Sequence, residues 1–219
     1  MDRHPANDGS LRLAPLSGQA PELCIAILHG VGASANAMQP VAQALAKGLP
    51  TAAVVALNGY DPFDLGGNGR QWFSVKGITE DNRPARVEAA LPRVDQAIAT
   101  EEARLGLTRR KTVILGFSQG AILALHMAAS SPNPPMAVIA LAGRLAGPPS
   151  PAPQPRPPVL LSHGAMDAVI QVAHMDAAAT ALREAGCLVQ TLQIPGLGHA
   201  IHPQQIERTL HFLTAITAS

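Results

Sequence analysis

The 219-residue chain is poor in cysteine, in aromatic residues and in charge, and each shortage excludes a class of protein. Two cysteines are too few for a disulfide framework, and we expect both to be reduced, as in the cytoplasm. Charged residues make up 14% of the chain, with a formal net charge of +1, so no nucleic-acid partner is expected. No apolar run approaches the ~18 residues of a membrane span, so no integral membrane association is expected.

Apolar residues make up 47% of the chain, which is enough for one compact domain with a full core. The first ten residues are polar and lack the apolar stretch of a secretory signal, which also favours a cytoplasmic location. We expect residues 1–22 to be a polar N-terminal segment that contains an edge strand at most, and residues 23–219 to form a single domain. The sequence leaves the oligomeric state open, and a homodimer is compatible with it.

Strand-like and helix-like patterns alternate along the chain. Apolar runs rich in branched residues predict buried strands, and the alternating run at 188–194 predicts an edge strand. Helical spacing of apolar residues predicts helices between them, with a kink at Pro92. The alternation predicts an α/β fold whose mainly parallel sheet is covered by helices on both faces. The predicted strands are 23–28, 51–57, 112–117, 136–141, 158–163 and 188–194, and the predicted helices are 36–47, 84–105, 170–185 and 203–217.

Two segments interrupt this alternation. Residues 147–158 are proline-rich and predict a stiff, exposed loop. Residues 58–83 form a connection longer than the ~15 residues at which a loop usually has a function of its own or is disordered. Three glycines within it, Gly66, Gly67 and Gly69, suit a small flap that moves.

The sequence GFSQG at 116–120 has the G-x-S-x-G pattern of a nucleophile elbow. It ends a predicted strand and precedes a helix, so Ser118 is expected on a sharp turn that lifts its hydroxyl out of the carboxyl edge of the sheet. The next backbone amide, on Gln119, then points at the substrate oxygen. A glycine-flanked serine also arises by chance in a chain with 19 glycines, and the strand-to-helix setting is what favours the functional interpretation.

A serine nucleophile needs a base, and the base needs an acid that orients it. In elbow enzymes these follow in the order serine, acid, histidine. Asp167 lies in a loop after a predicted strand, at the carboxyl edge of the sheet. His199 lies in a glycine-rich loop after the last strand, where an imidazole can reach the serine. We therefore expect Ser118, Asp167 and His199 to form a catalytic triad.

His202 is the alternative to His199 as base, and its place beside Pro203 suits the start of the last helix instead. The His199–His202 pair also has the form of a metal site, but its spacing differs from the helical i, i+4 pair and no cysteine or acid lies nearby in sequence. We expect no metal and no organic cofactor.

The turn after the first buried strand, HGVGAS at 29–34, is a source for a second oxyanion donor. The backbone N–H of Val31 or of a close neighbour is expected to pair with that of Gln119. His29 is expected to hold this turn through hydrogen bonds. An ordinary tight turn explains its glycines equally well.

Five blocks, LHGVG, GRQWFS, GFSQG, SHGAMD and GLGHAI, together resemble the phospholipase/carboxylesterase family, which includes acyl-protein thioesterases. The resemblance spans roughly residues 23–216. It implies an α/β-hydrolase fold without a large cap domain, and a serine hydrolase that cleaves carboxylic esters, thioesters or lysophospholipids through an acyl-enzyme at Ser118. Its small-molecule substrate would then be an ester or an acyl-thioester.

Aromatic residues point to the place of the acyl group. Four of the six lie within 60–73, and Phe117 adjoins the nucleophile. Trp72 and Phe73 match the family's WF block, so with Phe117 they are the expected substrate contacts. Anchoring of the long loop to the body explains Tyr60 and Phe63 nearly as well.

Two other functions fit parts of the sequence. GVGASA at 30–35 matches the G-x-G-x-x-G/A fingerprint of a dinucleotide-binding turn, but the next strand ends at Asn58 and Gly59, where that motif expects an acid. A non-catalytic binding module on a hydrolase fold is the other alternative. Both leave the set of Ser118, Asp167 and His199 unexplained.

Overall fold

The computed structural model describes residues 8–149 and 156–217, and its centre is a seven-stranded sheet. Six strands run parallel, and the short strand β1 pairs antiparallel with β3 at one edge. The order across the sheet is β1-β3-β2-β6-β7-β8-β9. The strands are β1 (Leu11–Leu13), β2 (Leu23–Leu28), β3 (Ala52–Leu57), β6 (Thr112–Phe117), β7 (Ala137–Leu141), β8 (Val159–Gly164) and β9 (Val189–Ile194).

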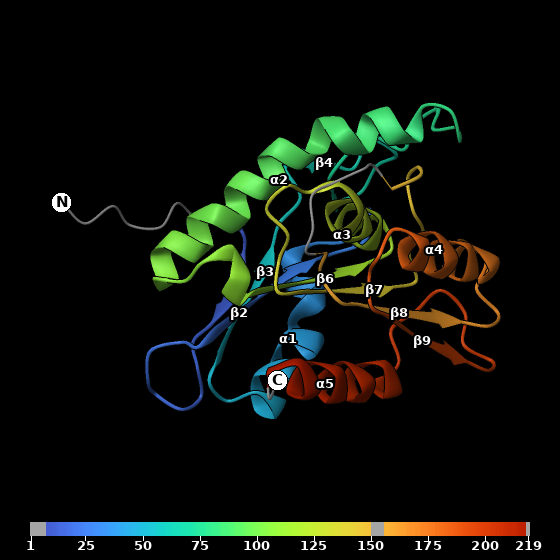
Figure 1. The fold of residues 1–219 in the computed structure, drawn as a ribbon. Coiled ribbons are helices and arrows are strands. Elements are labelled where there is room, and N and C mark those ends of the chain that lie inside the picture. The colour runs from blue at the N-terminus through green and yellow to red at the C-terminus, as the bar shows by residue number, and fades with distance from the viewer. Residues whose placement is uncertain (1–7, 150–155, 218–219) are drawn as a thin grey trace.

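Helices cover both faces of this sheet (Figure 1). On one face lie α2 (Arg83–Leu105), α3 (Gln119–Ser130) and α4 (Ala173–Glu184). On the other lie α1 (Gln39–Gly48), which follows the short 3-10 helix η1 (Ala35–Met38), and α5 (Pro203–Thr217). The other helices turn an apolar stripe toward the sheet, whereas α3 is buried almost throughout. Helices on both faces explain why the central strands are almost continuous apolar runs.

The core therefore has two layers, one on each face of the sheet. Side chains alternate along each strand, so Ala26 and Leu28 join the layer under α2, α3 and α4, whereas Ile25 and Ile27 join the layer under α1 and α5. All four residues of this strand are at most 1% exposed. Complete burial of such a central strand on both faces leaves only its ends near solvent.

The predicted α/β class, with a mainly parallel sheet covered by helices on both faces, is confirmed, and the strand limits agree to within a residue of the predicted ones. β9 lies at the edge of the sheet, as its alternating sequence predicts. Two helices differ in detail: 36–47 divides into η1 and α1, and the helix expected from residue 170 begins at Ala173. Pro92 lies inside α2, which continues on both sides of it.

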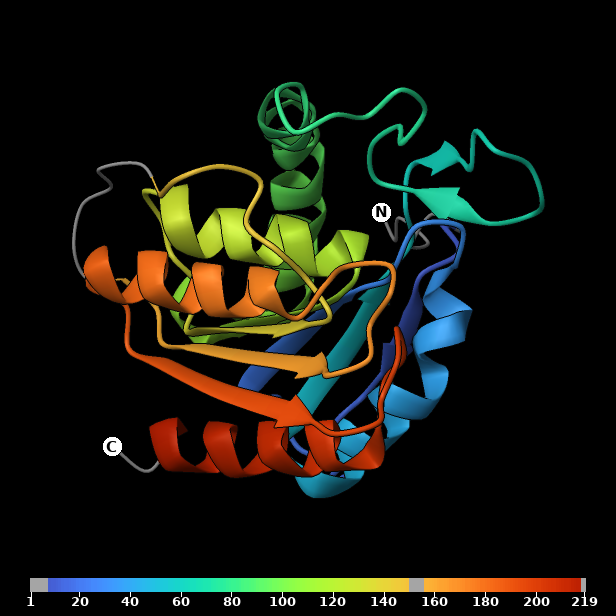
Figure 2. The ribbon, with the colours of Figure 1, turned by 90° about the vertical axis from the view of Figure 1, so that its right-hand side faces the viewer.

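The long connection at 58–83 contains a small hairpin of β4 (Asp61–Pro62) and β5 (Arg70–Gln71). Figure 2 shows this hairpin beyond the sheet, on the side toward which the parallel strands point. The predicted proline-rich loop at 147–158 falls mostly on residues 150–155, which lie outside the described part of the chain. No helix of the described residues is long and apolar enough to cross a membrane.

Candidate active site

Ser118 lies at the sharp turn between β6 and α3. Its φ of 53° and ψ of −115° are rare for a residue with a side chain, so the surrounding structure must hold this strain. The flanking glycines make the turn possible. A Cβ on Gly116 would come within 2.2 Å of the Gly120 carbonyl oxygen, and one on Gly120 within 2.1 Å of the Leu28 carbonyl oxygen. The turn therefore excludes any larger residue at both positions.

Three polar side chains from separate loops meet at this turn. His199 Nε2 lies 2.9 Å from Ser118 Oγ, and His199 Nδ1 lies 2.7 Å from Asp167 Oδ2. Asp167 follows β8 and His199 follows β9, so both come from the carboxyl ends of neighbouring parallel strands. The sheet thus brings together residues that are 32 and 81 positions apart in sequence.

The charge of Asp167 sets the tautomer of His199. Burial on its own raises the pKa of the Asp167 carboxyl, but hydrogen bonds from His199 and from the backbone amides of Ile170 and Val169 outweigh burial and lower this pKa below the ordinary value of an aspartate. Asp167 is therefore an anion at neutral pH and accepts the proton on His199 Nδ1. The lone pair of Nε2 then faces the hydroxyl of Ser118.

A second histidine, His163, holds the loop that carries Asp167. It is 1% exposed, its Nε2–H donates to the Ile170 carbonyl oxygen at 2.7 Å, and Nε2 also lies 3.2 Å from Asp167 Oδ2. Sequence reasoning passed over His163 because it precedes Asp167 in the chain. The sequence does place His163 next to the last residue of a buried strand, and a polar side chain at that position indicates a role at the carboxyl edge of the sheet.

The turn at 29–34 lies directly against Ser118. A Cβ on Gly30 would come within 3.2 Å of Ser118 Cβ. Within the described part of the chain, the backbone N–H groups of Val31 and Gln119 have no protein acceptor, so both are available for a ligand. His29 holds the turn as expected, since Gly59 N–H donates to His29 Nε2 at 2.9 Å and Nδ1 bonds to the Gly30 carbonyl oxygen at 2.7 Å.

The hairpin at 61–71 closes the other side of this turn. Gly32 N–H donates to the Arg70 carbonyl oxygen at 2.8 Å, and Arg70 N–H donates to the Ala33 carbonyl oxygen at 2.7 Å. These pairings occupy main-chain groups that a pyrophosphate would need in a dinucleotide-binding turn. The arrangement therefore gives no support to the dinucleotide alternative.

Trp72 and Phe73 occupy a different place from the one their sequence suggests. They are 2% and 6% exposed, and both belong to the core layer under α2, α3 and α4. Trp72 Nε1–H donates to the His29 carbonyl oxygen at 2.8 Å. The side chain of Gln119 joins the same assembly, with its Oε1 accepting from Trp72 N–H and its Nε2 donating to the Phe73 carbonyl oxygen. The two aromatic residues thus anchor the long loop to the elbow, and their burial gives no support to the expected substrate contact.

Phe117 lies beside His199 and lines a cavity. Its ring centroid lies 5.1 Å from that of His199, and both residues line a cavity of about 700 Å³. This cavity runs between α1 and the start of α5, on the face of the sheet opposite to Trp72. We call it the α1/α5 groove.

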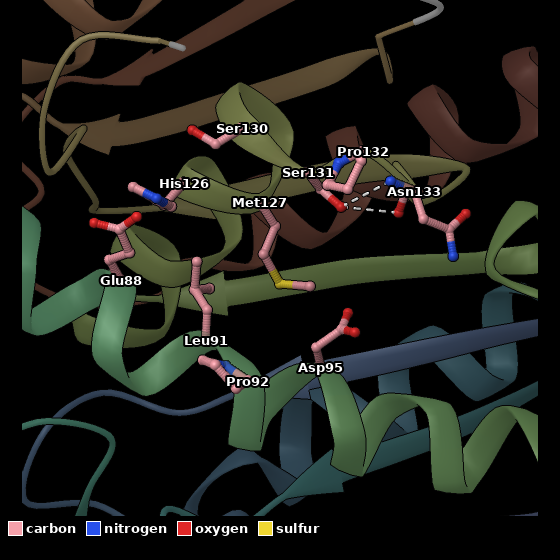
Figure 3. A pocket seen from close by; sticks show the side chains of 10 residues that line it. All are labelled: Glu88, Leu91, Pro92, Asp95, His126, Met127, Ser130, Ser131, Pro132 and Asn133. Atoms are coloured by element: carbon pink, nitrogen blue, oxygen red, sulfur yellow. Dashed lines mark hydrogen bonds between the residues drawn. The ribbon is translucent and has the colours of Figure 1, made fainter. Parts of the chain in front are cut away.

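Another cavity, of about 370 Å³, lies between α2 and the far end of α3 (Figure 3). Its polar lining includes Glu88, Asp95 and His126. Burial lowers the pKa of His126, while the charge of Glu88 acts in the opposite direction. His126 is eight residues beyond Ser118, so this cavity lies about 12 Å along α3 from the elbow.

The described residues contain no group of three or more metal-binding side chains. In the His199–His202 pair, both ring nitrogens of His199 face Ser118 and Asp167. His202 Nδ1 accepts from Gln204 N–H at 3.2 Å, and His202 N–H donates to Gln205 Oε1 at 2.8 Å. His202 therefore caps the start of α5, as its place beside Pro203 predicts.

The strained serine between strand and helix, the sheet topology and the hydrogen-bonded side chains define the molecule as an α/β-hydrolase with a serine at its nucleophile elbow. Comparison with known proteins then gives the family. The pattern of the Phospholipase/Carboxylesterase family matches residues 16–217, so the chain belongs to that family.

Individual relatives agree with this assignment. The chain is 40% identical to Esterase YpfH of Escherichia coli over 189 residues, which cover 85% of this chain and 80% of YpfH. Among solved structures, esterase PE8 has a TM-score of 0.86 at 29% identity, covering 94% of this chain and 98% of PE8. SOBER1 of Arabidopsis thaliana has a TM-score of 0.72 at 25% identity, covering 89% of this chain and 99% of SOBER1.

Proposed function

We propose that this esterase-class hydrolase cleaves carboxylic esters in two steps through an acyl-enzyme on Ser118. The observation that carries the proposal is the unbroken chain of hydrogen bonds from Ser118 Oγ through His199 to the Asp167 carboxylate, at 2.9 and 2.7 Å. Serine is a weak nucleophile on its own, and this arrangement supplies both the base and the group that orients it.

In the first step, Ser118 Oγ attacks the ester carbonyl carbon while His199 Nε2 takes the hydroxyl proton. The carbonyl oxygen becomes an oxyanion, which accepts hydrogen bonds from the free N–H groups of Val31 and Gln119. The bond to the leaving oxygen then breaks, and His199 returns the proton to that oxygen. The acyl group stays on Ser118, and the alcohol departs.

In the second step, water repeats the attack. His199 Nε2 takes a proton from water, and the hydroxide oxygen attacks the acyl carbon. The bond to Ser118 Oγ breaks, Oγ recovers the proton, and the carboxylic acid leaves. Thioesters follow the same steps with a thiol as leaving group, because the attack takes place at the acyl carbon in both cases.

The role of Asp167 is to hold His199 in the tautomer that leaves Nε2 free to accept. Its carboxylate stays charged through the reaction and stabilises the imidazolium that forms in each step. The hydrogen bonds from His199 and from the backbone amides of Ile170 and Val169 keep this carboxylate ionised.

The test is Ser118→Ala, measured on p-nitrophenyl acetate and with a fluorophosphonate. We expect kcat to fall by about 10⁴-fold or more, as in other serine triads, and covalent labelling to disappear. Ser130→Ala, at the other end of α3, is the control and should label and turn over like the wild type. Near-normal turnover of Ser118→Ala, or labelling at another residue, would remove Ser118 as the nucleophile.

We further propose that residues 23–219 work as one catalytic domain in a reducing compartment such as the cytoplasm. Cys24 and Cys187 are both buried and free, and burial raises the pKa of the Cys24 thiol to about 12 and also raises that of Cys187. Thiols of this kind act as small apolar residues. Thiol titration of the purified protein should find two free thiols after unfolding, and a disulfide would contradict the proposal.

A further inference from the structure

The α1/α5 groove has the composition of a site for a hydrocarbon chain. Its floor consists of the buried side chains of Met38, Val41 and Ile206. Small or apolar residues such as Ala37 and Ala44 form its walls, and they are at least partly exposed to solvent. A volume of about 700 Å³ is within the ~300–1,000 Å³ of small-molecule sites.

The groove begins beside the proposed nucleophile, among residues that contact or adjoin Ser118. Phe117, which precedes Ser118, and His199 line it at one end. Gly30 lines the same end and lies against Ser118. A chain attached to a carbonyl carbon at Ser118 Oγ can therefore enter the groove directly.

The far end of the groove is closed by contact between its two helices. Leu210 of α5 packs against Gly48 of α1, where a Cβ would come within 2.5 Å of the leucine side chain. From Pro203 to Leu210 the helix rises about 10 Å, a length that suits an extended chain of about eight carbons.

The reaction decides which half of the ester occupies the groove. The leaving alcohol and the attacking water must both exchange a proton with His199 Nε2, so they use the same side of the acyl carbon. Water needs polar partners, and the groove walls next to His199 are Phe117, Ala200 and Ile201. An apolar groove therefore suits the acyl chain, which stays in place through both steps.

The ionisable side chains of the groove limit the acyl groups that it can bind. Glu207 is the only acidic or basic side chain among its lining residues apart from two histidines. It lies exposed on the rim, where it disfavours an acyl chain with a second carboxylate.

We propose that the α1/α5 groove binds the acyl chain, so that the preferred substrates are esters of unbranched, uncharged fatty acids of about eight carbons, with Ala44 and Leu210 setting the limit of length. This inference depends on the proposed nucleophile at Ser118. It moves the acyl site from the Trp72–Phe73 loop to the opposite face of the sheet.

The experiment compares kcat/KM for p-nitrophenyl acetate, butyrate, hexanoate, octanoate and dodecanoate, which differ only in the acyl group. In the wild type we expect kcat/KM to rise about two- to fourfold for each buried methylene, up to octanoate, and not beyond. Ala44→Phe should leave acetate within about twofold of wild type and lower octanoate by about tenfold or more. Leu210→Ala should extend the rise to dodecanoate.

Gln43→Phe is the matched control, because it adds the same ring to the exposed side of α1. Its chain-length profile should equal that of the wild type. A second series, acetate esters of alcohols of increasing length, should respond little to Ala44→Phe.

Two results would overturn the inference. One is a chain-length profile that Ala44→Phe and Leu210→Ala both leave unchanged. The other is a response of the alcohol series, and not of the acyl series, to these variants. If fluorophosphonate still labels Ser118, either result would show that the α1/α5 groove is not the acyl site. The assignment of Ser118 as the nucleophile would be unaffected. Loss of the Ser118 assignment itself would show as labelling and acetate turnover that survive in Ser118→Ala.

Discussion

A substitution of the Gln119 side chain should lower the stability of the elbow and leave its catalytic function in place. Gln119 is 3% exposed, and its amide group joins two buried main-chain groups: Oε1 accepts from Trp72 N–H at 2.9 Å, and Nε2 donates to the Phe73 carbonyl oxygen at 2.7 Å. The proposed catalytic contribution of Gln119 comes from its backbone N–H instead. Gln119→Met should remove the two side-chain hydrogen bonds and keep the backbone N–H in place.

The structure sets the size of the effect. Methionine has nearly the shape of glutamine, so it leaves little cavity, but it leaves the N–H of Trp72 and the carbonyl of Phe73 buried without partners. Each unsatisfied group costs about 1–3 kcal/mol, so the free energy of unfolding should fall by about 2–6 kcal/mol. For a chain of this size the midpoint of thermal unfolding should fall by roughly 5–20 °C.

Thermal unfolding followed by circular dichroism measures the stability, and p-nitrophenyl acetate hydrolysis at 25 °C measures the chemistry. We expect kcat of Gln119→Met to stay within about tenfold of wild type, well short of the 10²–10³-fold loss on removal of an oxyanion donor. Gln43→Met, on the exposed side of α1, is the control and should match the wild type. An unchanged unfolding midpoint would refute the reasoning, as would a large loss of kcat without loss of stability.

Two further predictions concern histidines outside the proposed triad. His163→Leu removes the donor to the Ile170 carbonyl that holds the Asp167 loop, so kcat should fall by about 10- to 100-fold with little change in KM. Burial lowers the pKa of His29, with an opposing hydrogen bond from Nδ1 to the Gly30 carbonyl and a further decrease from the charge of Arg70. The folded protein therefore keeps His29 neutral where the unfolded chain binds a proton. The free energy of unfolding should fall as the pH decreases below about 6.5, as measured by urea unfolding between pH 7 and 5.

Each of these predictions has a conservative variant as control. His163→Gln retains an N–H donor at nearly the same place and should recover most of the lost kcat; equal losses in both variants would contradict the positioning role. His29→Asn removes the titrating ring, so its stability should depend less on pH over this interval. Burial also lowers the pKa of His126 and His174, so part of the dependence should remain. An unchanged slope in His29→Asn would show that His29 does not contribute to it.

Much of the fold follows from local patterns in the sequence. A continuous apolar run such as 112–117 indicates a strand that is buried on both faces. An amphipathic stretch such as 203–217 indicates a helix that covers one face of the sheet. Hydrophobic periodicity therefore predicts the layers of the fold. The nucleophile elbow is local too, because two glycines and a strained serine within five residues specify the turn. Chain order and loop position predict Asp167 and His199 as its partners, because parallel strands bring their carboxyl ends to one edge of the sheet.

The contributions of other residues depend on contacts that no local pattern describes. Trp72 looks like a substrate contact in sequence, but it is buried because the hairpin folds back on His29 and Gln119. Gln205 donates to Ser162 Oγ at 2.9 Å and thereby ties the start of α5 to β8, a contact that links residues 43 positions apart. These contacts depend on how helices and strands pack, and the spacing of residues along the chain does not predict them.

The sequence by itself determined the order of strands and helices and the class of chemistry, because hydrophobic periodicity and the elbow act over a few residues. Only the tertiary structure decided where the apolar groove lies. Val41 and Ile206 are far apart in the chain, and they share a groove because α1 and α5 pack side by side on one face of the sheet. The shape of a cavity is a property of such packing, and a single strand or helix does not encode it.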